Sequence, residues 1–120
     1  MLDESERARV LDELRRMVWS YSHSEEGGWL RDFDWSSVPV TFKDLKNGVC
    51  GMYSFGKIVL LTSGEMRPIF PIYVHELRHR WQWRKSPLRY LIGKVVRPLI
   101  ENDADREERK AEQWLNECSK

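Results

Sequence analysis

Two histidines stand four residues apart in the stretch YVHELRHRWQW, from Tyr73 to Trp83, and a glutamate directly follows the first of them. Residues four apart on a helix are separated by about 40° around the axis and about 6 Å along it, so the imidazoles of His75 and His79 can reach one metal ion. Glu76 would lie beside that ion, where its carboxylate can accept and return a proton. The spacing favours a zinc site with a general base over a chance pairing of histidines on a surface helix.

A catalytic zinc ion needs three protein ligands and one open position for water, so a third ligand must lie elsewhere in the chain. The pattern HExxHxxGxxH is excluded, because Gln82 and Lys85 occupy the positions of its glycine and third histidine. His23 is the only other histidine and lies far upstream, which makes a carboxylate the expected ligand. Two glutamates seven residues apart are candidates: Glu101 in the pattern E-x-x-A-D and Glu108 in the pattern E-x-x-A-E.

The combination of HELRH and ENDAD resembles the gluzincin zinc metallopeptidases, in which HExxH on one helix is joined by a glutamate from a following helix. The resemblance extends from about Gly51 to Leu115. It implies that Zn²⁺ is the cofactor and that Glu76 is the general base and acid of peptide hydrolysis. The metal ligands that it implies are His75, His79 and Glu101.

The same resemblance implies roles for residues around the metal. Asp105 would accept a hydrogen bond from a ligand histidine, and Glu108 is the alternative third ligand. Tyr90 is the first candidate for stabilising the oxyanion, and Tyr53 is the second. The stretch GMYSFGKIVLLTS would provide an edge strand that aligns a peptide or protein substrate in an extended conformation.

Hydrophobic periodicity predicts the elements that would position these residues. Asp3 and Glu6 form a capping-box start for a first helix. Pro71 suits the first turn of the helix that carries HELRH. The pattern predicts an α+β fold in one domain, residues 1–120, with a small antiparallel sheet packed against the first helix and the HELRH helix. The expected helices are 3–21, 71–85, 88–96 and 98–117, and the expected strands are 38–42, 49–54 and 57–63.

Composition limits the environment of the protein. With 20 basic and 19 acidic residues, the net charge of +1 gives no general attraction to nucleic acid or membranes. Cys50 and Cys118 lie too far apart for a cysteine zinc motif or a disulfide framework. The charged N-terminus and the lack of a long apolar stretch predict a soluble, cytoplasmic protein without a membrane span.

The segment 78–97 supports other interpretations, because it contains seven basic residues and no acid, with Trp81, Trp83 and Tyr90 among them. Cations beside aromatic rings could bind single-stranded nucleic acid or lie on an anionic membrane. Alternatively, the tryptophans fill the core and the arginines pair with the acidic final helix. The alternative function is a zincin fold without proteolysis that acts as a nucleic-acid-binding or protein-binding module.

Overall fold

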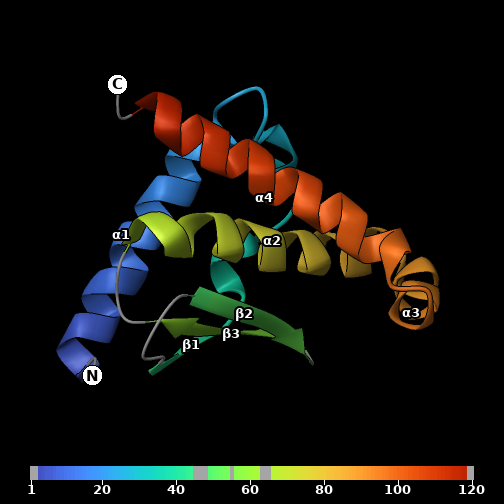
Figure 1. Cartoon of the computed structure of the whole chain (residues 1–120), viewed down its shortest axis with the longest axis horizontal. Helices are drawn as coiled ribbons and strands as arrows, with labels where there is room; N and C mark the ends of the chain where they lie inside the picture. Colours follow the sequence, from blue (N-terminus) through green and yellow to red (C-terminus); the bar gives the residue numbers. More distant parts are fainter. Residues whose placement is uncertain (1–2, 45–48, 55, 63–65, 119–120) are drawn as a thin grey trace.

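The computed structural model describes residues 3–44, 49–54, 56–62 and 66–118, and these residues form helices and one small sheet. The α+β class expected from the sequence is confirmed. In Figure 1, α2 crosses the middle of the molecule, with the sheet on one side and α4 on the other. The helices are α1 (Glu4–Ser22), α2 (Met66–Lys85), α3 (Pro87–Val95) and α4 (Pro98–Cys118), the 3₁₀ helices are η1 (Gly28–Asp32) and η2 (Trp35–Ser37), and the strands are β1 (Val40–Asp44), β2 (Val49–Ser54) and β3 (Lys57–Thr62).

The sheet is mixed, so the expectation of an antiparallel sheet is wrong for one of its two strand pairs. Its order is β1-β3-β2: β2 and β3 are antiparallel, and β1 lies parallel to β3 with Val40 opposite Ile58. Gly56, with φ of +76°, lies in the turn between β2 and β3. β3 contributes the fully buried Ile58 and Leu60, so burial favours it as the central strand, with β2 left at the edge. The turn signal at 46–48 lies outside the described residues.

Helix α1 forms as its sequence predicts. The carboxylate of Asp3 caps the helix by accepting a hydrogen bond of 2.8 Å from the backbone N–H of Glu6. One stripe of apolar side chains is buried against the rest of the fold: Val10, Leu14, Val18 and Tyr21. This stripe joins the same hydrophobic cluster as α2 and the sheet.

Helix α2 begins five residues earlier than expected, at Met66, so Pro71 lies inside the helix and not in its first turn. A proline inside a helix removes one backbone hydrogen bond. Ile69 and Phe70, which precede it, are fully buried, and their burial offsets that loss. The HELRH residues lie in the middle of α2, as predicted.

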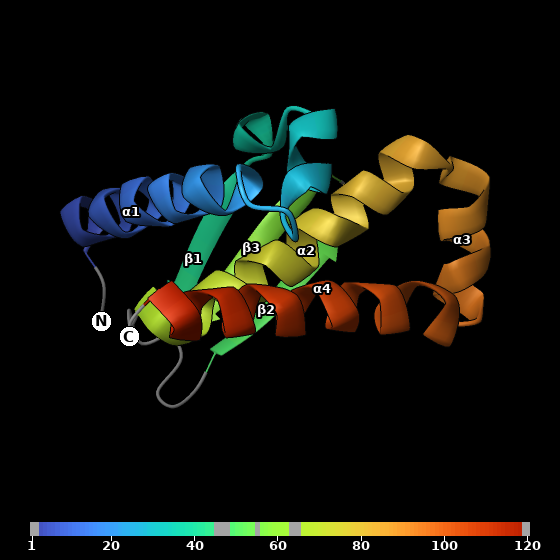
Figure 2. The ribbon, with the colours of Figure 1, turned by 90° about the horizontal axis from the view of Figure 1, so that it is seen from above.

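Helices α3 and α4 complete the frame around the site. α3 lies at one end of the long axis of the molecule, where it connects α2 to α4 (Figures 1 and 2). A Cβ atom added to Gly93 of α3 would lie 2.4 Å from Ile100 Cγ2, so α3 packs very closely on the start of α4. Among the described residues, no helix has the length and apolar character needed to cross a bilayer.

Candidate metal centre

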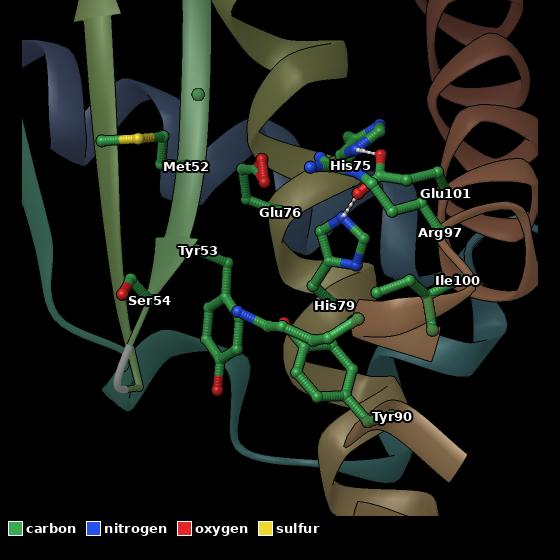
Figure 3. Close-up of a pocket in the computed structure, with 12 residues that line it drawn as sticks. Met52, Tyr53, Ser54, His75, Glu76, His79, Tyr90, Arg97, Ile100 and Glu101 are labelled. Carbon is green, nitrogen blue, oxygen red and sulfur yellow. Dashed lines mark ion pairs between the residues drawn. The ribbon is translucent and has the colours of Figure 1, made fainter. Parts of the chain in front are cut away.

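The residues with metal-binding chemistry face a cleft of about 380 Å³ between β2, α2 and the start of α4. Helix α2 contributes His75, Glu76 and His79, the strand β2 contributes Gly51 to Ser54, and α4 contributes Glu101. Figure 3 shows both histidines turned toward Glu101, with Glu76 on the side of the strands. The ligand atoms of His75, Glu76 and His79 lie within 4.8 Å of one another.

The carboxylate of Glu101 faces the Nε2 atoms of both histidines. Its Oε2 atom lies 3.3 Å from His75 Nε2, and its Oε1 atom lies 3.1 Å from His79 Nε2. The two imidazole rings are nearly perpendicular, with centroids 4.9 Å apart. The sequence offers two glutamates as a third ligand. Glu101 is the one whose carboxylate contacts the Nε2 atoms of both histidines.

Gln82 fixes the orientation of His79. The amide nitrogen of Gln82 donates to the backbone oxygen of Ile100 and to Asp103 Oδ2, both at 2.9 Å, so its oxygen is turned toward His79 Nδ1, also at 2.9 Å. An oxygen at that position requires a proton on Nδ1. In the neutral imidazole, Nε2 then carries a lone pair, and that lone pair is directed at the carboxylate of Glu101.

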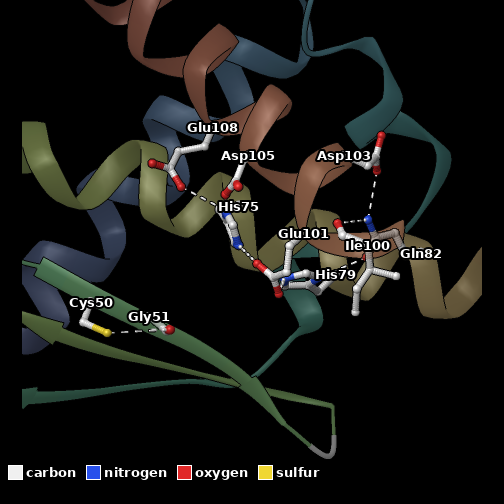
Figure 4. Close-up of polar contacts among 10 residues, drawn as sticks. All are labelled: Cys50, Gly51, His75, His79, Gln82, Ile100, Glu101, Asp103, Asp105 and Glu108. Atoms are coloured by element: carbon white, nitrogen blue, oxygen red, sulfur yellow. Dashed lines mark hydrogen bonds and ion pairs between the residues drawn. The ribbon is translucent and has the colours of Figure 1, made fainter. Parts of the chain in front are cut away.

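The other nitrogen of His75 faces two further acids of α4, as Figure 4 shows. His75 Nδ1 lies 2.9 Å from Glu108 Oε1 and 3.3 Å from Asp105 Oδ1. Both are ion-pair distances. Glu108, the other candidate for the third ligand, therefore contacts a candidate ligand and shares with Asp105 the position behind His75.

Burial and neighbouring charges perturb the two histidines in opposite directions. Burial acts to lower the pKa of His75, but Glu108, Glu76 and Glu101 together outweigh it and raise that pKa. At His79, burial outweighs the hydrogen bond that Nδ1–H donates to Gln82 and the charge of Glu101, and the pKa is lowered. The neutral form, which is the one that binds metals, is therefore favoured at His79.

Glu76 is almost completely buried, with 4% of its surface exposed. Burial raises its pKa to about 7, opposed by His75 and assisted by Glu101 and Glu108. A carboxyl group with a pKa near neutrality can both accept and return a proton. Gly51 makes room for it, because a Cβ atom there would lie 3.0 Å from Glu76 Cγ and 2.7 Å from Ile72 Cγ2.

The two candidate tyrosines differ in how their hydroxyl groups are used. Tyr53 accepts a hydrogen bond of 3.2 Å from Arg80 Nη1. Tyr90 is 5% exposed, and burial raises its pKa to about 12. Its ring lies 6.1 Å from that of His79, and its hydroxyl has no hydrogen bond within the part of the chain that the structure describes. Tyr90 is therefore the one whose hydroxyl is available to a ligand in the cleft.

Arg78 fastens α2 to α4 next to the site. Its Nε and Nη2 atoms donate to the two oxygens of Asp103 at 2.7 and 3.1 Å, while its guanidinium lies 4.8 Å from the ring of Trp29 and 3.7 Å from that of Trp81. Bidentate pairing and stacking together hold the guanidinium in one orientation. Because Asp103 also binds Gln82, this clamp sets the position of α4 from which Glu101 reaches the histidines.

Several residues of the site were not identified from the sequence. In the sequence, Gln82 only excludes the pattern HExxHxxGxxH. Its place three residues after His79, on the same helix face, could have indicated a contact with that histidine. Lys94 and Arg97 also line the cleft. No local pattern indicates them, because their place depends on how α3 folds back between α2 and α4.

Comparison of the chain with protein-family models, with curated proteins and with solved structures gives no match. The function is therefore inferred from the residues and their geometry.

Proposed function

We propose that the protein is a zinc-dependent metallopeptidase with a zincin-like domain, in which His75, His79 and Glu101 hold the metal. The observation that carries this proposal is one carboxylate placed 3.3 and 3.1 Å from two imidazole Nε2 atoms. Ligand atoms with bonds of about 2.0–2.1 Å to a tetrahedral zinc ion lie roughly 3.3 Å apart, so the spacing fits a shared metal.

The hydrogen bonds around the histidines support the same assignment. Gln82 commits the Nδ1 proton of His79 and leaves a lone pair opposite a carboxylate oxygen. Two electron-rich atoms at such a distance repel each other unless a proton or a cation lies between them. On His75, Asp105 and Glu108 lie at Nδ1 and leave Nε2 for the metal, which is the arrangement in which carboxylates orient metal-binding histidines.

A bound zinc ion would supply Lewis acidity, which polarises a carbonyl group and makes a water molecule acidic near neutral pH. Glu76 would take a proton from water and deliver it to the leaving amine nitrogen. The hydroxyl of Tyr90 would donate a hydrogen bond to the carbonyl oxygen as negative charge develops on it. The edge strand β2 lines the cleft, and one of its sides has no strand partner among the described residues, so an extended peptide could pair with its backbone.

Zinc content and hydrolysis, measured on the same preparations, test this proposal. We expect about one zinc ion per chain in the wild type and loss of zinc in His75→Ala. Glu76→Gln should keep zinc and the fold while lowering hydrolysis of a fluorogenic peptide library by at least about a hundredfold. Glu112→Gln, an exposed position on α4, is the matched control and should leave both quantities unchanged.

The result separates hydrolysis from metal binding alone. Unchanged hydrolysis in Glu76→Gln would exclude Glu76 as the proton carrier. A wild-type protein that contains zinc but cleaves no peptide in the library would refute the peptidase function and leave a metal-binding protein. Wild-type protein that binds no zinc at all would refute the metal centre.

A further inference from the structure

Helix α3 has an apolar stripe that no described element covers. Leu88, Leu91, Ile92 and Val95 recur at the spacing i, i+3, i+4, i+7, which normally marks the face of a helix that packs in a core. In this protein their exposed fractions are 71, 54, 50 and 85%. The opposite face of α3 is the packed one, because Tyr90 and Gly93 are buried. Val96 and Leu99, in the turn to α4 and its first residues, are also about half exposed.

Basic side chains border this stripe on both sides. With about 100° between successive residues, the four apolar residues cover an arc of roughly 100°, and Arg89 and Lys94 each lie roughly 110° from its centre, on opposite sides. Arg84, in the last turn of α2, and Arg97, in the turn after α3, add exposed cations. The whole segment 78–97 contains no acidic residue. We define Leu88, Leu91, Ile92, Val95 and these four cations as the α3 surface.

A short amphipathic helix with cations along the edges of its apolar face is typical of segments that lie in a membrane interface. α3 occupies one end of the long axis of the molecule, so a flat surface can approach it without contacting the rest of the fold (Figures 1 and 2). At nine residues it is too short to cross a bilayer but long enough to place its four apolar side chains among lipid headgroups.

Two other occupants fit the α3 surface less well. In a symmetric dimer through this face, the flanking cations of two copies would meet, and like charges oppose that contact. Single-stranded nucleic acid would require exposed rings for stacking. The rings of this segment are engaged within the fold, since Trp81 lies against Arg78, and Trp83 lies against the buried Tyr90. The exposed side chains are aliphatic, and these enter lipid but do not stack on bases.

We propose that the α3 surface docks on an anionic membrane, with its apolar stripe inserted at the headgroup level and its cations paired with lipid phosphates and carboxylates. This inference does not depend on metal binding. Lys94 and Arg97 also line the cleft, so docking would hold the cleft close to the bilayer surface.

Sedimentation with lipid vesicles tests the proposal. The wild type should bind vesicles of phosphatidylcholine mixed with phosphatidylserine. It should bind vesicles of pure phosphatidylcholine much more weakly. The double variant Leu91→Ser/Ile92→Ser should weaken binding at least about tenfold. Each cation removed should weaken vesicle binding about fivefold, so Arg84→Glu/Arg89→Glu should weaken it more than about twentyfold. The remaining affinity should depend less on salt concentration.

Controls and opposing outcomes are available in the same chain. Trp19→Ser removes a side chain that is 60% exposed from α1, and Arg16→Glu reverses an exposed charge there, so neither should change binding. Circular dichroism would verify that all variants fold. Absence of wild-type binding at low salt would overturn the proposal. Two other results would also overturn it. In the first, the wild type binds no vesicles but forms a dimer, and Leu91→Ser/Ile92→Ser abolishes the dimer. In the second, the wild type binds single-stranded DNA but no vesicles, and this binding depends on Arg84 and Arg89 alone.

Discussion

The geometry of Glu101 leads to a quantitative prediction for zinc affinity. In structural sites with four ligands, zinc binding contributes about 10–16 kcal/mol, which is roughly 3 kcal/mol for each ligand. That share corresponds to about a hundredfold in the dissociation constant. Glu101 contacts both Nε2 atoms, so Glu101→Ala removes one of the three proposed ligands and should weaken zinc binding by at least about a hundredfold.

Glu108→Ala is the matched comparison, because it removes the same side chain from the same helix. Glu108 lies 2.9 Å from His75 Nδ1, behind a proposed ligand, and Asp105 lies 3.3 Å from the same atom. Residues that orient a ligand typically cost about 10–100-fold in metal affinity when removed. Either acid can still contact His75 when the other is removed. Each single variant should therefore lose zinc affinity by only about tenfold, near the lower end of that range.

Competition with a chromophoric zinc chelator at fixed pH measures these constants, and circular dichroism verifies that each variant is folded. Zinc affinity should be highest in the wild type and lowest in Glu101→Ala. The single variants Glu108→Ala and Asp105→Ala should lie between them, with similar affinities. A larger loss in Glu108→Ala than in Glu101→Ala would refute the reasoning. In that case His75 would bind the metal through Nδ1, and Glu108 would be the third ligand.

Three further substitutions test how the site is built. Gly51→Ala places a Cβ atom 2.7 Å from Ile72 Cγ2, and should lower the free energy of unfolding in urea by about 1–3 kcal/mol; an unchanged midpoint would mean that β2 approaches α2 less closely. Asp103→Ala leaves Arg78 without its carboxylate and should cost about 2–4 kcal/mol in the same measurement; a loss within error would show that stacking alone holds the guanidinium. Tyr90→Phe should retain zinc and stability but lower kcat by about a hundredfold; unchanged kcat would exclude the hydroxyl from catalysis.

The helices were predictable because their signals are local. The cap at Asp3, the stripe of α1 and the position of HELRH in the middle of its helix all follow from residues close in sequence. The pairing of β1 was not predictable in this way. Its partner is β3, and β2, which comes between them in the sequence, lies at the far edge of the sheet. The burial of Ile58 and Leu60 favours β3 as the central strand. No turn signal in the sequence indicates this strand order.

The site shows the same division. His75, Glu76 and His79 follow from the spacing of one helix, whereas the choice between Glu101 and Glu108 depends on how α4 crosses α2. Both glutamates lie on one face of α4, seven residues apart, so helical periodicity alone cannot separate them. The angle at which α4 lies against α2 brings one of them to Nε2 of both histidines and the other to Nδ1 of His75.

The clamp at Arg78 limits how far this protein can be divided. A fragment of α2, α3 and α4 would contain every proposed ligand, but it would lack Trp29, one of the two rings that enclose the guanidinium. The same cut would expose the side of α2 that packs against the buried stripe of α1. The N-terminal segment, which contributes none of the proposed ligands, thus supports the proposed metal centre structurally, and we expect a minimal peptide to bind zinc more weakly than the whole chain.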